Sequence, residues 1–270
     1  MQNRYVADEG DFAKFGLLRA LAGVYPLDES PASLGVVWYR PDIETGSPGD
    51  GSQRNYLNDT QQRFRRCDLE LFDSLKGISA TNRHVNAIKE SGILGGSRAC
   101  FYNNEIQTPQ RNWSCNQREA ARAKWWSKAL ERVGSNQIVF LDPDNGLAPN
   151  SVPIRHKRAM KHAYLQEEVA SLVTAARQPV IVIYHHLGRS FDGRPAKQPE
   201  QMRKWAARLK HQLRLDTEPQ VLWHRGETAR AYFVLFPSDR DRTAAVRGRL
   251  DRFRDSPWFQ HGHYALPPLH

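Results

Sequence analysis

The chain of 270 residues is long enough for one large domain, and its 39 Lys and Arg against 29 Asp and Glu give a formal net charge of +10 and a sequence pI near 9.7. This surplus favours a polyanionic partner, because cations that neutralise phosphates release condensed counterions; a basic surface without such a role is the alternative. No apolar run approaches the roughly 18 residues that span a bilayer, and the N-terminus carries no signal-peptide core, so a membrane protein and a secreted protein are both disfavoured.

Apolar runs of strand length alternate with longer amphipathic stretches along the chain. In chain order we expect a helix over 12–21, a buried strand over 34–39, a long polar loop over 40–58, helices over 67–76 and 81–91, and a strand over 98–102. A helix over 116–132, a strand over 138–141, a helix over 159–177, a strand over 180–184, a helix over 198–213, strands over 220–224 and 230–236, and a helix over 239–254 follow.

This alternation is typical of a mostly parallel sheet covered by helices on both faces. Only residues 225–229 separate the last two strands, so we expect them to pair as an antiparallel hairpin. The predicted fold is therefore one α/β domain over residues 1–270, a three-layer α/β/α sandwich with a mostly parallel sheet and a late antiparallel hairpin.

The segment 142–146, Asp-Pro-Asp-Asn-Gly, follows a buried strand, and ligands of open α/β sheets bind at the carboxyl ends of strands. Its proline stiffens the exit from the strand and its glycine permits a tight turn. Asp142, Asp144 and Asn145 then form a rigid ledge that could orient water, bind a base edge or hold a metal. An ordinary turn is the alternative.

Two further strand ends carry reactive groups. His185 and His186 follow the strand over 180–184; neighbouring residues on a strand point to opposite faces, so we expect one imidazole at the site and the other packed. Arg189 could clamp a phosphate, with Ser190 beside it.

At the end of the first strand, Tyr39 or the tryptophan before it could stack on a flipped base, with core packing equally natural for one of them. Arg40 and Asp42 add a cation and a carboxylate that could bind substrate there.

The N-terminal segment supplies a fourth group. Asp11 is expected to cap the first helix, and because one cap suffices, Glu9 is left as a candidate catalytic carboxylate. Lys14 lies one helical turn after Asp11 and is a candidate for binding substrate. Basic residues mix with aromatics over 122–126 and 203–205, as phosphate contacts or as solvated helix faces.

Several chemistries lack support. There is no phosphate-binding GxxxxGK[ST] loop, no HExxH motif and no cysteine pair: Cys67, Cys100 and Cys115 are an odd number without CxxC spacing. We therefore expect a cytoplasmic protein without a zinc site, a disulfide framework or a cofactor. A magnesium-dependent nuclease using Asp142 and Asp144 stays open, although a third ligand cannot be assigned.

The layout resembles class I methyltransferases, particularly the bacterial ribosomal RNA adenine methyltransferases. The segment 10–15, Gly-Asp-Phe-Ala-Lys-Phe, is similar to their short N-terminal motif, and the segment 142–145 occupies the place of their DPPY loop. The resemblance implies transfer of a methyl group from S-adenosylmethionine. The sequence departs from it after the first strand, where no GxG cradle follows, and in the loop, which lacks the second proline and the aromatic residue.

Two short loops also resemble the uracil-DNA glycosylase superfamily. The segment 141–146 looks like its water-activating loop, and the segment 185–190 looks like the later loop whose histidine stabilises the departing base. Prokaryotic antiphage glycosylases that remove modified cytosines are a related resemblance. Both imply an α/β/α enzyme that hydrolyses the N-glycosidic bond of a flipped base in DNA.

Base excision is the favoured interpretation, because it needs a carboxylate near the sugar and a donor near the base, but no cofactor. Methyl transfer is the runner-up; a metal-dependent nuclease and a non-catalytic nucleic-acid-binding domain are further alternatives. DNA is the expected partner, RNA remains an alternative, and no membrane partner is expected.

Overall fold

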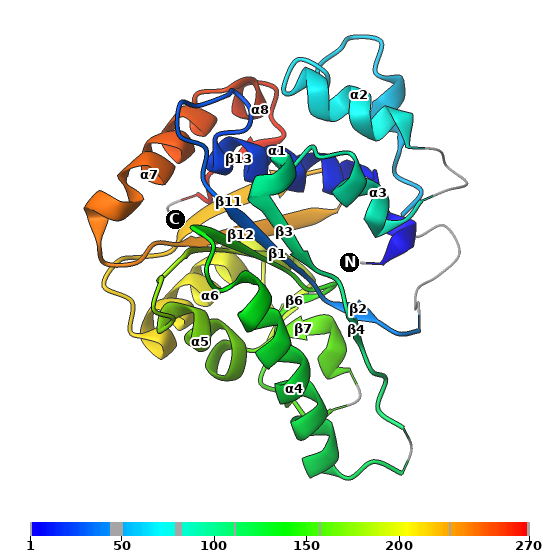
Figure 1. The fold of residues 1–270 in the computed structure, drawn as a ribbon, viewed down its shortest axis with the longest axis vertical. Coiled ribbons are helices and arrows are strands. Elements are labelled where there is room, and N and C mark those ends of the chain that lie inside the picture. The colour runs from blue at the N-terminus through cyan, green and yellow to red at the C-terminus, as the bar shows by residue number, and fades with distance from the viewer. Residues whose placement is uncertain are drawn as a thin grey trace.

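The computed structural model describes residues 2–43, 51–78, 83–110, 112–156, 158–226 and 228–268. Within these residues seven strands form one sheet in the order β13-β11-β12-β8-β5-β1-β3 (Figure 1). The strands are β1 (Leu34–Trp38), β3 (Ala99–Tyr102), β5 (Ile138–Asp142), β8 (Val180–His186), β11 (Gln220–Arg225), β12 (Ala229–Leu235) and β13 (Tyr264–Ala265).

The strand directions give a mostly parallel sheet with an antiparallel side. β3, β1, β5 and β8 run parallel to one another, with Leu34 opposite both Ala99 and Ile138. β12 is antiparallel to β8, and β11 and β12 form an antiparallel hairpin in which Gln220 lies opposite Val234. The late antiparallel hairpin predicted from the sequence is therefore confirmed.

Helices cover both faces of the sheet (Figure 1). One face is covered by α1 (Glu9–Ala22), α2 (Leu69–Gly77), α3 (Val85–Glu90), α7 (Arg240–Arg254) and α8 (Pro257–Gln260); the other is covered by α4 (Cys115–Val133), α5 (Ala170–Val173) and α6 (Gln198–Leu213). Neighbouring strand residues alternate between two cores: Val36 and Phe140 pack in the first, and Val37 and Leu141 in the second. The three-layer α/β/α prediction is confirmed.

Short elements extend the carboxyl edge of the sheet. β2 (Arg40–Pro41) pairs with β4 (Glu105–Ile106), β6 (Gly146–Leu147) with β7 (His162–Ala163), and β9 (Ser190–Phe191) with β10 (Arg194–Pro195). Turns of 3-10 helix lie at Asn3–Tyr5, Asn55–Asn58, Gly96–Arg98 and Ala159–Lys161, and a π-helical turn spans Leu165–Val169. β2, β6 and β9 each follow a long parallel strand, so the irregular parts of the chain gather where a ligand would bind.

The single long helix predicted over 159–177 is wrong. The segment divides into a 3-10 turn, the strand β7, a π-helical turn and the short α5. Glu168 explains the break: it is fully buried, and its carboxylate accepts hydrogen bonds from Arg122 Nε at 2.6 Å and from the Tyr39 hydroxyl at 2.9 Å. A buried carboxylate needs such partners, and this requirement outweighs local helical periodicity.

Two smaller predictions also need correction. Asp8, not Asp11, caps α1, because its carboxylate accepts the Asp11 backbone N–H at 2.8 Å. The helix predicted over 81–91 covers only Val85–Glu90 in the structure, and residues 79–82 lie outside the described residues. The part of the predicted loop at 44–50 also lies outside them.

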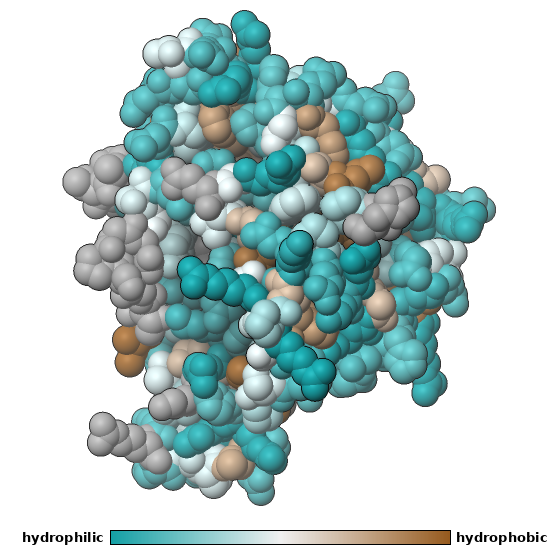
Figure 2. Space-filling view, turned by 180° about the vertical axis from the view of Figure 1, so that it is seen from behind, coloured by the Kyte–Doolittle hydropathy of each residue, from teal (hydrophilic) through white to brown (hydrophobic). Residues whose placement is uncertain are grey.

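The outer surface is predominantly polar. Figure 2 shows a face dominated by hydrophilic residues, with hydrophobic ones in small separate patches. Across the part of the chain that the structure describes, no helix combines the length and the apolar character needed to cross a membrane.

Candidate active site

A polar cavity of about 410 Å³ lies where β5 and β8 end; we call it the strand-end pocket. It is enclosed by the N-terminal segment and the first turns of α1, the loop after β5, the end of β8 and the start of β12. Its lining residues are Gln2, Tyr5, Asp8, Gly10, Asp11, Lys14, Gly51, Gln53, Asp142, Pro143, Asp144, Asn145, Lys161, Tyr184, His186, Thr228 and Arg230.

A buried ion-pair network forms the floor of the strand-end pocket. Lys14 Nζ lies 2.9 Å from Asp11 Oδ1 and 2.8 Å from Asp142 Oδ2, and all three side chains are buried. Burial alone would lower the pKa of Lys14, but the two carboxylates raise it well above its usual value. Lys14 is therefore a permanent cation, and Asp142 serves to hold it.

Asp8 and Asp11 put two more carboxyl groups at this wall. Asp11 accepts the Ala7 backbone N–H at 3.0 Å as well as the Lys14 ammonium. Burial raises the pKa of Asp11 to about 7; Lys14 opposes this shift and Asp8 adds to it. Burial also raises the pKa of Asp8, against the lowering effect of Arg230. This wall therefore changes its charge near neutral pH.

Arg230 adds a cation to the lining of the strand-end pocket. Arg230, at the start of β12, lies directly opposite His186 at the end of β8 in the antiparallel register. The Arg230 guanidinium packs against α1 at Gly10. A Cβ on Gly10 would lie 2.6 Å from Arg230 Cζ, so only glycine leaves room for this approach. Burial lowers the pKa of His186 and nearby Arg230 lowers it further, so the imidazole is neutral at pH 7.

Asp144 is less buried than Asp142. Its side chain is half-buried, and Oδ2 accepts from Gln2 Nε2 at 2.7 Å. Asn145 beside it is exposed, and its backbone N–H donates to the Lys161 carbonyl at 2.9 Å, which fixes the loop. The two aspartates of this loop thus have different roles: Asp142 holds a cation, and Asp144 faces the cavity.

Comparisons of the chain with protein families, with curated proteins and with solved structures gave no significant match. Among the residues in the described ranges, no three or more His, Cys, Asp and Glu side chains are grouped so that they could hold a metal ion.

The structure brings together five of the residues singled out from the sequence. Lys14, Asp142, Asp144, Asn145 and His186 all line the strand-end pocket, although they come from α1, the loop after β5 and the end of β8.

His185 lies away from the strand-end pocket. It is buried, its ring packs against Trp205 and Phe233, and Nδ1 accepts the Leu147 backbone N–H at 3.0 Å. Gly146 has a φ of +90°, and a Cβ there would lie 2.3 Å from His185 Nδ1. One histidine thus reaches the site and the other packs in the core, as strand alternation predicts.

The proposed stacking role of Tyr39 needs correction. Its side chain is fully buried, its hydroxyl donates to Glu168, and its ring centroid lies 5.0 Å from that of Trp125. Trp38 is also fully buried, against Phe101. Neither ring can stack on a base in this arrangement; both are core residues.

Five other candidates also lie outside the pocket lining. Arg40 forms an ion pair with Glu105 at 3.0 Å, and Asp42 accepts from the Thr108 hydroxyl. Arg189 and Ser190 are exposed before and within β9. Glu9 lies in the first turn of α1, where its Oε1 is 3.9 Å from His224 Nε2.

Sequence reasoning missed Arg230, Tyr184, Lys161 and Asp8 as site residues, and Asp11 was interpreted as a helix cap. Arg230 did carry a signal, because a cation that begins an otherwise apolar strand needs a partner. The backbone turn that presents Lys161 gave no comparable signal.

Proposed function

We propose that the strand-end pocket is the active site of an enzyme that acts on nucleic acid, and that the reaction is hydrolysis of the N-glycosidic bond of a flipped base. The observation that carries the proposal is that one cavity is lined by the half-buried carboxylate of Asp144, by the Arg230 guanidinium and by the neutral imidazole of His186. A cavity of about 410 Å³ lies in the usual range for small-molecule sites and suits one nucleoside.

The chemistry follows from where charge develops. As the bond between C1′ and the base nitrogen breaks, the sugar becomes positive and the base takes the electron pair. Asp144 would stabilise the sugar and accept a proton from the water whose oxygen attacks C1′. The Arg230 guanidinium would stabilise the departing base, with His186 as a neutral hydrogen-bonding partner. The proton taken from water finally reaches the base, which completes the hydrolysis.

The ion-pair network supports this division of roles. Asp142 is 3% exposed and bonded to Lys14, so it is poorly placed to meet water, whereas Asp144 is half-buried beside the exposed Asn145. Lys14 would offset the negative charge of the two carboxylates in the floor of the cavity. The net charge of +10 favours a polynucleotide over a neutral small substrate.

Methyl transfer to a base is the second candidate, and one contact favours it. The 2.8 Å ion pair between Lys14 and Asp142 joins the two segments that resemble adenine methyltransferases. Two other features favour hydrolysis instead. In a methyltransferase loop of this kind a carbonyl would have to accept the target amine, but the Pro143 carbonyl already accepts the Gly146 N–H at 3.3 Å. The cofactor would lie just beyond β1, where the buried Tyr39 follows the strand.

One assay distinguishes these reactions. The protein is incubated with oligonucleotides that contain ordinary or modified bases, and free base is measured by mass spectrometry together with alkali-labile abasic sites. Base excision predicts both products without added metal or S-adenosylmethionine. Incorporation of labelled methyl without base release would favour the second candidate, and nicking that requires magnesium would indicate a nuclease.

A matched pair of variants tests the assignment of Asp144. We expect Asp144→Asn to lower the rate of base release by roughly 10² to 10⁴, the range for loss of a general base. Asp255→Asn, which changes an exposed aspartate after α7, should leave the rate unchanged. Equal rates for Asp144→Asn and the wild type would show that the carboxylate is assigned wrongly.

A further inference from the structure

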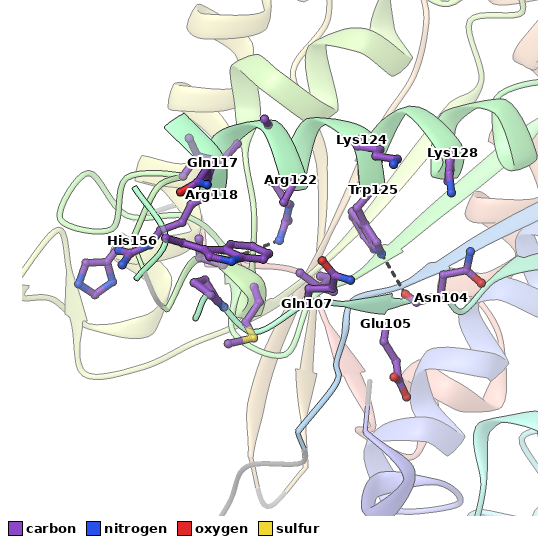
Figure 3. A pocket seen from close by; sticks show the side chains of 18 of the residues that line it. Asn104, Glu105, Gln107, Gln117, Arg118, Arg122, Lys124, Trp125, Lys128 and His156 are labelled. Atoms are coloured by element: carbon purple, nitrogen blue, oxygen red, sulfur yellow. Dashed lines mark hydrogen bonds between the residues drawn. The ribbon is translucent and has the colours of Figure 1, made fainter. Parts of the chain in front are cut away.

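A second cavity, of about 570 Å³, lies beneath α4; we call it the α4 groove. It is bounded by α4, by the segment that follows β3 and by the segment that ends in the 3-10 turn Ala159–Lys161. Figure 3 shows Lys124 and Lys128 one helical turn apart on α4, with Trp125 below them directed toward Asn104.

The charges of the α4 groove favour an anion. Arg118, Lys124 and Lys128 line it, and both lysines are exposed. The carboxylate of Glu105 also lines it, but lies 3.0 Å from the guanidinium of Arg40. Arg118 is half-buried, and its Nη1 donates to the Arg155 carbonyl at 3.4 Å.

The α4 groove also offers a planar platform. Trp113 lines it and is half-buried, so part of its ring is accessible. Trp125 is held in place from below: its Nε1 donates to the Asn104 carbonyl at 2.9 Å, and the Arg122 guanidinium lies 4.9 Å from its ring. Lysines and an accessible indole that line one groove are the combination with which proteins bind unpaired nucleotides, with the phosphates on the cations and the bases on the ring.

The α4 groove and the strand-end pocket lie on two sides of one turn. Ala159 and Met160 line the groove, and the next residue, Lys161, lines the pocket. A strand whose reacting base occupies the pocket could therefore continue past this turn into the groove.

We infer that the α4 groove binds the unpaired nucleotides that flank the base held in the strand-end pocket, so that the substrate is a single strand or a locally opened duplex. This inference rests on the proposed function, because it takes the pocket to hold the reacting base. The cations bind the phosphates and Trp113 stacks on a flanking base.

Anisotropy of a fluorescently labelled single-stranded oligonucleotide of about 12 deoxythymidines tests the inference with the full chain over a range of salt concentrations. The test variant is Lys124→Ala/Lys128→Ala. The matched control is Lys76→Ala/Lys89→Ala, which also removes two charges from exposed lysines, but on α2 and α3 (Figure 1).

Loss of two phosphate contacts should reduce the slope of log K against log salt by about 1.4, which corresponds to roughly a tenfold weaker complex near 0.15 M salt. The control should keep the wild-type slope. Trp113→Ala should weaken binding without changing the slope, and Trp113→Phe should retain most of the affinity. A fully paired duplex of the same length should bind less tightly than the single strand.

Equal slopes for the wild type and Lys124→Ala/Lys128→Ala would overturn the inference, and so would an equal loss in the control. The base-release assay distinguishes failure of this inference from failure of the proposed function. Binding that depends on the groove without base release would contradict the function alone, whereas base release by an enzyme whose strand binding ignores the groove would contradict the inference alone.

Discussion

Replacement of Lys14 by methionine tests the ion-pair network beneath the strand-end pocket. Lys14 is 6% exposed and lies between Asp11 and Asp142, which are 1% and 3% exposed. Methionine keeps much of the side-chain volume but leaves both carboxylates without their cation. Removing one partner of a buried ion pair costs about 3–5 kcal/mol, because a charge stays buried without compensation. We expect the free energy of unfolding at pH 8 to fall by that amount.

The pH dependence of this loss gives a second check. In the wild type, the pKa of Asp11 is raised to about 7, so the folded state binds the extra proton and its stability falls as pH rises from about 4 to 7. The raised pKa of Lys14 keeps its contribution intact until strongly alkaline pH. Without the ammonium, the pKa of Asp11 rises further, so the stability of the variant keeps falling above pH 7 and the loss is smaller at pH 5.

Urea unfolding at pH 5, 7 and 9 measures these quantities for the wild type, for Lys14→Met and for the control Lys76→Met, which changes an exposed lysine on α2. Adding Asp142→Asn to Lys14→Met should restore part of the loss, because one of the uncompensated carboxylates is gone. A cost below about 1 kcal/mol for Lys14→Met at pH 8, or the same cost at every pH, would refute the reasoning.

Two further predictions concern the Arg230 guanidinium and the neighbouring histidines. Gly10→Ala should displace the Arg230 guanidinium and lower base release by roughly 10², whereas Gly248→Ala, where the added methyl meets little, should not; unchanged kinetics for Gly10→Ala would contradict the packing argument. His185→Leu should cost about 1–3 kcal/mol of stability, because a buried backbone N–H loses its acceptor. His186→Ala should instead lower activity with little change in stability, and the reverse pattern for this pair would show that the two roles were exchanged.

Sequence periodicity was sufficient to predict most of the fold. Apolar runs of strand length and amphipathic stretches depend on local residue order, so the central strands and the late hairpin could be identified. The region 159–177 could not, because the backbone there follows Glu168, which pairs with Arg122 from a helix 46 positions earlier in the chain. Tertiary contacts of that kind leave no periodic signal.

Apart from Lys14 on α1, the residues of the candidate site could be predicted only where they follow a strand end. Asp142 and Asp144 could be identified, because the carboxyl edge of a parallel sheet is where ligands bind. The direction in which Tyr39 points depends on which face each helix layer covers, and composition does not specify this. Arg230 joins the pocket through the pairing of β12 with β8, a contact between segments distant in sequence.

Release of free base from an oligonucleotide, measured by mass spectrometry for the wild type and for Asp144→Asn, tests the central proposal most directly. We predict that the wild type releases base and leaves abasic sites without added cofactor, and that Asp144→Asn is slower by at least about 10². Absence of base release from every substrate, together with incorporation of labelled methyl from S-adenosylmethionine, would contradict base excision at the strand-end pocket.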